Sequence, residues 1–438
     1  MTAPIAAGVR TENAGETKRD HKLEGLRGYL ALGVVVYHVA FYAGLTSFLD
    51  LPTHGIWTIL ADGLSVCLAP FFVLSAFFLY RPFARAVLAG TKHPPARPFW
   101  WRRFLRLIPA YWVVVTFALL VFDINKIDGF WYAARPYLLM HFYWPNAPWI
   151  TGLVPTWTVP AEMLFYLILP GIAVLIGRFA RKAATLEAKR RRMVAPLTLF
   201  AVIGFAWTVY TNVPSQLDTA VVYNLWYWPF GYYDAFAIGM LLATVSAYHQ
   251  VSGKTPRSYA FVAKHPNVLW ALALVVFVVN LNRFFGKLGM GDWASFNQEL
   301  VIHALVLLFA GLIVAPLTVP GVRSRLMEIT LNPRPIRFVG RISYGVYLWH
   351  MVVVSLLLKQ GPLFGNTPGF GPELYGAANF WWLLTWTTVG TIAVSAVSYY
   401  LLEQPLSKLG GRRKPDPAPP AAEPAVKTGQ AVEVPAAP

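Results

Sequence analysis

The chain contains 438 residues, of which 56% are hydrophobic, 15% aromatic and only 13% charged. Soluble domains carry about 25% charged residues, because polar groups must cover a surface that faces water. The composition therefore excludes a soluble globular enzyme, a disordered chain and a nucleic-acid-binding domain, and it indicates several membrane spans. The single cysteine, Cys67, excludes a disulfide framework and a thiolate metal site.

Ten apolar segments are long enough to cross a bilayer, whose hydrocarbon core of about 30 Å requires about 20 apolar residues in a helix. The sequence therefore predicts an all-α polytopic membrane protein with about ten transmembrane helices. The segments lie near residues 27–47, 57–80, 107–122, 157–177, 195–213, 229–248, 268–284, 298–318, 343–360 and 379–402.

A further apolar segment, residues 131–144, is shorter and is interrupted by Arg135 and Pro136. A charged residue and a helix breaker at mid-length are unfavourable in the hydrocarbon core. We expect an interfacial or re-entrant helix there.

The basic residues predict the orientation in the membrane, because Lys and Arg concentrate in cytosolic connections. Most of the 37 Lys and Arg residues lie at the two ends of the chain and in alternate connections. The exceptions are Lys126, Arg135, Arg283, Lys287 and Lys359. We therefore expect both termini in the cytosol and an even number of spans. The net charge of +17 is then a signal of topology and does not imply nucleic acid.

Two polar segments flank the predicted membrane domain, residues 23–405. Residues 1–22 mix acidic and basic side chains without an apolar stretch, so they are not a cleaved signal peptide. Residues 406–438 are rich in Pro and Ala and cannot bury a core, which predicts a disordered cytosolic tail. We expect no attached soluble domain at either end.

The first span contains Arg27 and His38, and ionisable residues inside a membrane are functional candidates. Eleven residues advance a helix by about three turns, so both side chains share one face about 16 Å apart. Arg27 is expected at the cytosolic edge and His38 near mid-membrane. Histidine exchanges a proton near neutral pH, as a general base must, although a neutral histidine bonded to a neighbouring helix fits equally well.

Glu162 is expected a few residues from the outer side of its span. A carboxylate there needs a partner, which could be His38, an arginine or a proton in a functional site, or Trp157 in a structural one.

Asp234 and His350 are two further polar residues inside predicted spans. Each could bind substrate or serve a structural role. Asp234 lies near a helix end, where it could anchor the helix, and His350 has Tyr and Trp neighbours that could satisfy its ring.

Arg103 and Arg106 are one helical turn apart at the cytosolic edge of the third span. Arginines bind phosphates through two hydrogen bonds at once, so this pair could hold an anionic cofactor such as coenzyme A. The tendency of cytosolic connections to be basic explains the same residues. The sequence contains no phosphate-binding glycine loop, and its histidines lack metal-ligand spacing, so we expect no bound metal.

Residues 22–405 resemble the bacterial acyltransferase family 3, the membrane O-acyltransferases. The resemblance rests on seven short motifs in the family's order, at residues 22–38, 70–82, 102–112, 155–170, 232–239, 341–350 and 399–405. Ala76 replaces the usual glycine of the second motif, a change expected to tighten helix packing.

The resemblance implies transfer of an acyl group, acetyl or another short chain, from cytosolic acyl-CoA to a hydroxyl of an envelope carbohydrate or glycolipid. It also implies a bacterial cytoplasmic membrane location, with the enzyme acting alone or with a separate envelope-biosynthesis partner. Arg27, Arg103 and Arg106 would hold the phosphates of acyl-CoA, and His38 would act as general base or acyl carrier. Glu162 would fix the tautomer of His38 or orient the acceptor.

Two other classes of protein fit the same residues. A proton-coupled transporter or flippase of a lipid-linked glycan could also use intramembrane His and Glu, although we find no internal repeat. A non-catalytic scaffold would not need Arg27, His38 and Glu162. Of the three classes, we therefore expect the acyltransferase.

Overall fold

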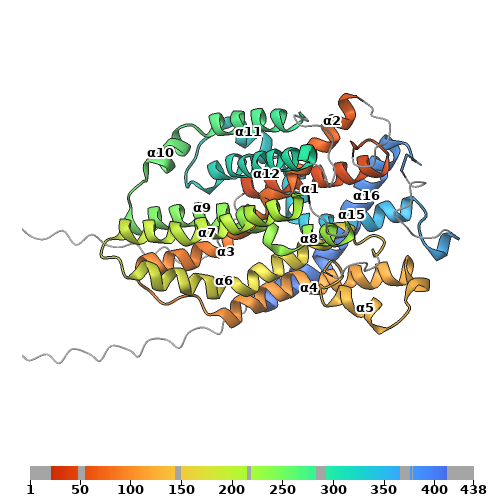
Figure 1. Ribbon diagram of the computed structural model, residues 1–438, viewed down its shortest axis with the longest axis horizontal. Coiled ribbons are helices and arrows are strands. Elements are labelled where there is room, and N and C mark those ends of the chain that lie inside the picture. Colours follow the sequence, from red (N-terminus) through yellow and green to blue (C-terminus); the bar gives the residue numbers. More distant parts are fainter. Residues whose placement is uncertain are drawn as a thin grey trace, which may run out of the picture.

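The computed structural model describes residues 21–47, 55–143, 149–214, 219–282, 293–365, 375–376 and 378–411. Its regular structure in these ranges is helical (Figure 1). The helices are α1 (His21–Tyr42), α2 (Ile56–Gly63), α3 (Ala69–Ala89), α4 (Ala96–Val121), α5 (Phe130–Tyr137), α6 (Thr158–Arg181), α7 (Leu186–Asn212), α8 (Thr219–Trp226), α9 (Tyr233–Ser252), α10 (Arg257–Lys264), α11 (Pro266–Asn280), α12 (Trp293–Val314), α13 (Arg325–Leu331), α14 (Arg334–Arg341), α15 (Ser343–Leu357), α16 (Phe380–Ser398) and α17 (Gln404–Gly411).

Within the described ranges, nine helical segments are long and apolar enough to span a membrane, and each corresponds to a predicted span. The predicted span at 268–284 differs. There α10 and α11 meet at an angle of 85°, so this pair is a broken span or a re-entrant element. The bend falls at His265, directly before Pro266, where proline disfavours a helical conformation of the preceding residue. The all-α, polytopic membrane architecture is confirmed.

Several basic residues that were expected in connections belong to helices. α3 continues to Ala89 and α4 starts at Ala96, so the connection between them covers only residues 90–95. It begins at Gly90, whose φ is 71°. Glycine adopts this left-handed conformation without strain, and the conformation ends α3 at this point. We call the end of the bundle that carries this turn the basic face; it lies at the left in Figure 1.

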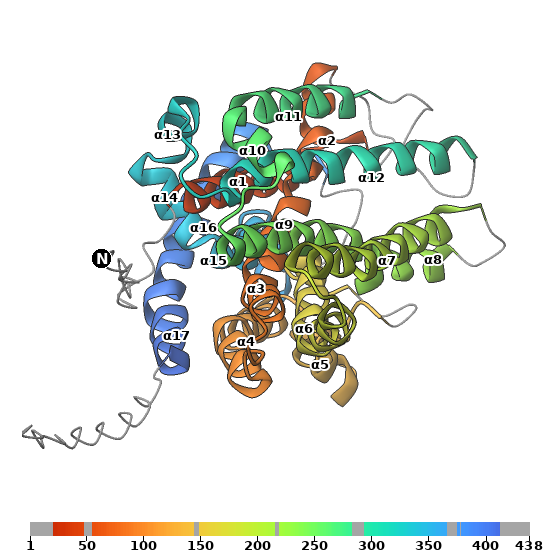
Figure 2. The ribbon, with the colours of Figure 1, turned by 90° about the vertical axis from the view of Figure 1, so that its left-hand side faces the viewer.

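Two other predicted segments have the following outcomes. In 131–144 the structure contains only the eight-residue helix α5, which is too short to span, and residue 144 lies outside the described residues. The tail predicted as disordered over 406–438 differs at its start, because residues 406–411 belong to α17, which packs against α4. Residues 412–438 and 1–20 lie outside the described residues. Figure 2 shows α17 beside α4 on the side of the bundle away from α7.

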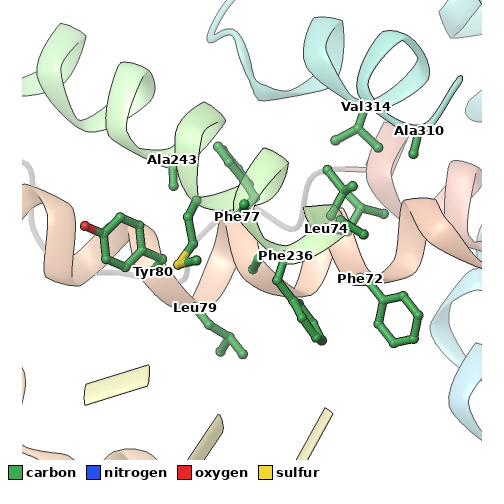
Figure 3. Close-up of a cluster of buried hydrophobic side chains, with 14 of the residues drawn as sticks. Phe72, Leu74, Phe77, Leu79, Tyr80, Phe236, Ala243, Ala310 and Val314 are labelled. Atoms are coloured by element: carbon green, nitrogen blue, oxygen red, sulfur yellow. The ribbon is translucent and has the colours of Figure 1, made fainter. Parts of the chain in front are cut away.

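The centre of the bundle is the contact between α3 and α9, with α12 packed on both (Figure 3). Phe72 and Phe236 lie against each other with ring centroids 5.1 Å apart, and both are fully buried. Further along the contact, Gly239 of α9 meets the backbone of α3 beside Ala76. The methyl group of Ala76 is accommodated because the facing residue has no side chain. The tighter packing expected from Ala76 therefore depends on Gly239.

Substitution of Gly239 by valine is predicted to disrupt the fold. A Cβ atom at this position would collide with the carbonyl oxygen of Val73 and lie 2.7 Å from the Ala76 methyl. We expect the melting temperature of the detergent-solubilised protein to fall, since overpacking costs about 1–3 kcal/mol or more. Gly171→Val on α6 is the control, because a Cβ there meets no atom within 4 Å. Equal melting temperatures for the two variants would contradict this account of the contact.

Candidate active site

Three arginines predicted to bind the donor lie around one cavity together with Glu162. Arg27 comes from α1, Arg103 and Arg106 from adjacent turns of α4, and Glu162 from the second turn of α6. The cavity has a volume of about 180 Å³, and we call it the arginine cavity. Its other walls are Leu68, Phe71, Phe72, Leu74, Ser75, Phe78, Leu79, Leu107, Thr158, Val159, Tyr166, Ser343, Tyr344 and Tyr347.

Hydrogen bonds to both neighbouring helices fix α4 at this level. The indole of Trp100 donates to the carbonyl oxygen of Tyr166 on α6 at 3.1 Å. The hydroxyl of Tyr344 on α15 donates to the carbonyl oxygen of Leu107 at 2.7 Å. The turn that carries Arg103 and Arg106 lies between these two bonds, so both guanidinium groups are held on a rigid support.

No carboxylate of the described residues is a direct partner of these three arginines. Within the described ranges, Arg27, Arg103 and Arg106 make no ion pair and no side-chain hydrogen bond, and the Nε atom of Arg103 is buried without a partner. Charged groups in apolar surroundings are stabilised chiefly by hydrogen bonds and opposite charge. An anionic ligand with several oxygen atoms would supply both.

Glu162 does not contact His38, as it would if it fixed the tautomer of that ring. Instead its carboxylate accepts hydrogen bonds from the hydroxyl of Tyr166 at 2.8 Å and from that of Ser75 at 3.2 Å. The reason is geometric: Glu162 faces the arginines, whereas the turn before α6 faces His38. Ser75 and Tyr166 were not identified from the sequence, although both lie in the family motifs and Tyr166 is one helical turn after Glu162.

A wider cavity adjoins the arginine cavity on the side of the basic face. It has a volume of about 970 Å³ and shares Arg27, Arg106, Phe78 and Tyr344 with the arginine cavity. Lys22, Arg81 and Arg341 add positive charge to its wall. We call it the basic vestibule. Two carboxylates, Glu24 and Glu403, lie in the same wall, so basic side chains outnumber acidic ones there by five to two.

His38 lies in a different cavity, of about 510 Å³, toward the opposite face. We call this the His38 cavity. Aromatic side chains provide most of its wall, among them Trp157, which is stacked on Tyr232 at a centroid distance of 4.9 Å. The other aromatic residues of the wall are Tyr37, Phe41, Tyr42, Trp149, Trp226, Tyr227, Tyr347 and Tyr375. Such rings offer both apolar faces and polar edges to a ligand.

Leu68 and Tyr347 line both the arginine cavity and the His38 cavity, so they form a common wall. The hydroxyl of Tyr347 donates to the carbonyl oxygen of Pro155 and accepts a hydrogen bond from Thr158 at 2.8 Å. Tyr347 was not identified from the sequence, although it lies three residues before His350. The wall places Arg27 on one side and His38 on the other, while both belong to α1.

His350 contacts His38 directly. Its Nε2 atom lies 3.3 Å from Nδ1 of His38, and the ring centroids are 4.9 Å apart. His350 is fully buried and lines none of the three cavities, whereas His38 is half-buried and faces its cavity.

Asp234 lies apart from all three cavities. Its carboxylate bonds to Nε2 of His303 on α12 at 2.6 Å and to the backbone N–H of Ala235 at 2.7 Å. This pair ties α9 to α12. Among the described residues, no group of three or more His, Cys, Asp or Glu side chains is arranged to hold a metal ion.

The fold and the site define a polytopic helical membrane protein with a cationic cavity reached from one face and an aromatic, histidine-containing cavity toward the other. Residues 20–400 match the family model described as an acyltransferase domain, so the chain belongs to this membrane acyltransferase family. The resemblance found in the sequence motifs is therefore confirmed.

Curated relatives carry acetyltransferase and nodulation names. The chain is 23% identical to the peptidoglycan O-acetyltransferase OatA of Listeria monocytogenes, over 89% of this chain and 56% of that protein. It is 23% identical to the O-acetyltransferase OatA of Staphylococcus aureus, over 78% and 52%. Nodulation protein 10 of Rhizobium leguminosarum is 24% identical, over 82% and 86%. The chain thus spans about half the length of the two OatA proteins. No solved structure matches.

Asp234→Ala is predicted to destabilise the protein without altering its chemistry. Loss of one partner leaves His303 without its 2.6 Å bond, and hydrogen bonds between membrane helices contribute about 1–2 kcal/mol. We expect a lower melting temperature and unchanged acyl transfer per folded molecule. Asp234→Asn, which keeps a hydrogen-bond acceptor, should lower the melting temperature by less than Asp234→Ala. A specific loss of transfer in a normally stable Asp234→Asn protein would mean that Asp234 belongs to the site.

Proposed function

We propose that the chain is an acyl-CoA-dependent O-acyltransferase of a bacterial cytoplasmic membrane. It would transfer acetyl, or another short acyl group, from cytosolic acyl-CoA to a hydroxyl of an envelope carbohydrate or glycolipid. The observation that carries the proposal is the convergence of Arg27, Arg103 and Arg106 in a cavity beside the basic vestibule, with no anion bonded to them among the described residues. Family membership and the names of the relatives support the reaction class.

The donor binds from the basic face in this proposal. Coenzyme A carries a diphosphate and a further phosphate at one end and the acyl thioester at the other. The phosphates suit the guanidinium groups, which form paired, charge-assisted hydrogen bonds with phosphate oxygens. The slender pantetheine arm suits the narrow, largely apolar remainder of the arginine cavity, and its thioester end would then pass between Leu68 and Tyr347 to reach the acceptor beside His38. Glu162 partly balances the three positive charges when no donor is bound.

The acceptor binds in the His38 cavity. A sugar ring has apolar faces and a polar edge, and the aromatic wall around Trp157 and Tyr227 offers the matching combination. The relatives named as peptidoglycan and other O-acetyltransferases favour an envelope glycan as acceptor. The lipid surface of the protein would let a membrane-anchored glycolipid enter the same cavity.

His38 is the general base. Its Nε2 atom has no hydrogen-bond partner among the described residues, and its ring faces the cavity. It would take the proton from the acceptor hydroxyl as the oxygen attacks the thioester carbonyl carbon. The carbon–sulfur bond then breaks, the thiolate leaves, and the proton passes from His38 to the thiolate. One ester and one thiol replace one thioester and one hydroxyl.

His38→Ala is predicted to abolish acylation of the acceptor. Mass spectrometry of envelope glycans and glycolipids, from cells with wild-type or variant protein at matched levels, should show loss of one acyl increment from a defined species. That species identifies both the acyl chain and the acceptor. Unchanged acylation would remove His38 from the mechanism, and accumulation of an unexported precursor with normal acylation would favour a transporter.

Arg103→Gln is predicted to raise the KM for acetyl-CoA. Loss of charge-assisted hydrogen bonds to phosphate costs roughly 1.5–3 kcal/mol of binding free energy, which corresponds to an increase in KM of about 10- to 100-fold. Arg192→Gln is the matched control, because Arg192 is exposed in α7 and lines none of the three cavities. Steady-state transfer rates in membrane vesicles provide the measurement. Equal KM values for the two variants would contradict donor binding by Arg103.

The basic face is predicted to lie in the cytosol. In a Cys67→Ala background, a cysteine at exposed Lys92 should react with a membrane-impermeant maleimide only after the cells are permeabilised. A cysteine at Asp128, in the exposed connection after α4, should react in intact cells. The opposite labelling pattern would place the basic vestibule outside and exclude cytosolic acyl-CoA as the donor.

A further inference from the structure

His350 is bonded to His38 but lines none of the three cavities, and we propose that it is a positioning residue for the base. In this inference, which rests on the proposed function, His350 holds His38 in the Nδ1–H tautomer and stabilises the positive charge that His38 acquires during transfer. His350 thus acts through His38 and not on the substrate.

Backbone carbonyl oxygens determine where the protons lie, because such an oxygen can only accept a hydrogen bond. Nδ1 of His350 lies 2.7 Å from the carbonyl oxygen of Tyr347 and 3.2 Å from that of Val346, so Nδ1 carries the proton. In the neutral ring, Nε2 is then an acceptor. It is this atom that lies 3.3 Å from Nδ1 of His38.

The same argument fixes the tautomer of His38. Its Nδ1 atom lies 2.9 Å from the carbonyl oxygen of Val34 and also faces Nε2 of His350. Both neighbours are acceptors, so Nδ1 must carry the proton. The other tautomer would direct three lone pairs at one another in a buried space. Nε2 of His38 is therefore left as a free acceptor at the cavity.

The contact changes in strength during the reaction. When Nε2 of His38 takes the hydroxyl proton, the ring becomes a cation, and its Nδ1–H then donates a charge-assisted hydrogen bond to His350. An interaction that strengthens as charge develops lowers the activation barrier. An interaction that is equally strong in the ground state and in the transition state would only tighten substrate binding. In serine hydrolases a buried carboxylate has this role. Here the acceptor is a neutral imidazole, which adds no negative charge to the membrane interior.

A structural role for His350 predicts a different dependence on its two nitrogen atoms. The bonds from Nδ1 to Val346 and Tyr347 stay within α15 and would serve local packing alone. The contact from Nε2 crosses to α1 and reaches His38. Glutamine places its terminal amide near the position of Nε2, whereas asparagine places its amide near the position of Nδ1.

The test compares His350→Gln with His350→Asn at matched protein levels in membrane vesicles. The readout is transfer of radiolabelled acetyl from acetyl-CoA to the envelope fraction. We expect His350→Asn to lower kcat on the order of 10- to 100-fold with an unchanged KM for acetyl-CoA, and His350→Gln to stay within about tenfold of wild type. Equal loss in both variants, or better function of His350→Asn, would overturn the positioning role.

A second measurement does not depend on turnover. Nitrogen-15 chemical shifts of histidine side chains distinguish the two tautomers, and comparison with a His38→Gln spectrum assigns the signal of His38. We expect the Nδ1–H form in the wild type and an increased share of the Nε2–H form in His350→Leu. An Nε2–H form in the wild type would overturn the inference. Absence of any transfer by the wild-type protein would instead overturn the proposed function.

Discussion

The structure depends on holding three guanidinium groups inside a protein that is surrounded by lipid. Unpaired charges are costly there, and a helix bundle provides few backbone groups to solvate them. The bonds from Trp100 and Tyr344 fix α4 against its neighbours, and the close contact of α3 with α9 braces the apolar wall opposite. Packing elsewhere in the bundle thus offsets the unfavourable free energy of burying these charges.

The bilayer is the reason that so much of the fold could be predicted. Its thickness sets the length of each apolar segment, so nine of the ten predicted spans have a matching helix. Helical periodicity also placed Arg27 and His38 on one helix, and Arg103 and Arg106 on successive turns. These are properties of single helices. Only the span at 268–284, which is bent before Pro266, departs from this rule within the described ranges.

The contacts between helices could not be predicted in the same way. Sequence gives the depth of a residue in its own helix but neither the rotation of that helix nor its neighbours. The sequence left His38, an arginine, a proton and Trp157 open as partners of Glu162, and the orientation of α6 directs its carboxylate to Ser75 and Tyr166. His350 was read as a side chain satisfied by aromatic neighbours, whereas α15 packs against α1 and brings the two imidazoles together. These contacts depend on the distances between helices, and the periodicity of one sequence does not contain that information.

The wall formed by Leu68 and Tyr347 has a consequence for the energy supply of the cell. A membrane that stores a proton gradient cannot tolerate a continuous file of water molecules through a protein with cavities toward both of its surfaces. Because the Tyr347 hydroxyl is already engaged by Thr158 and the Pro155 carbonyl, it offers little to a passing water chain. In the proposed enzyme this wall would therefore keep the water of the two cavities apart and limit proton leakage.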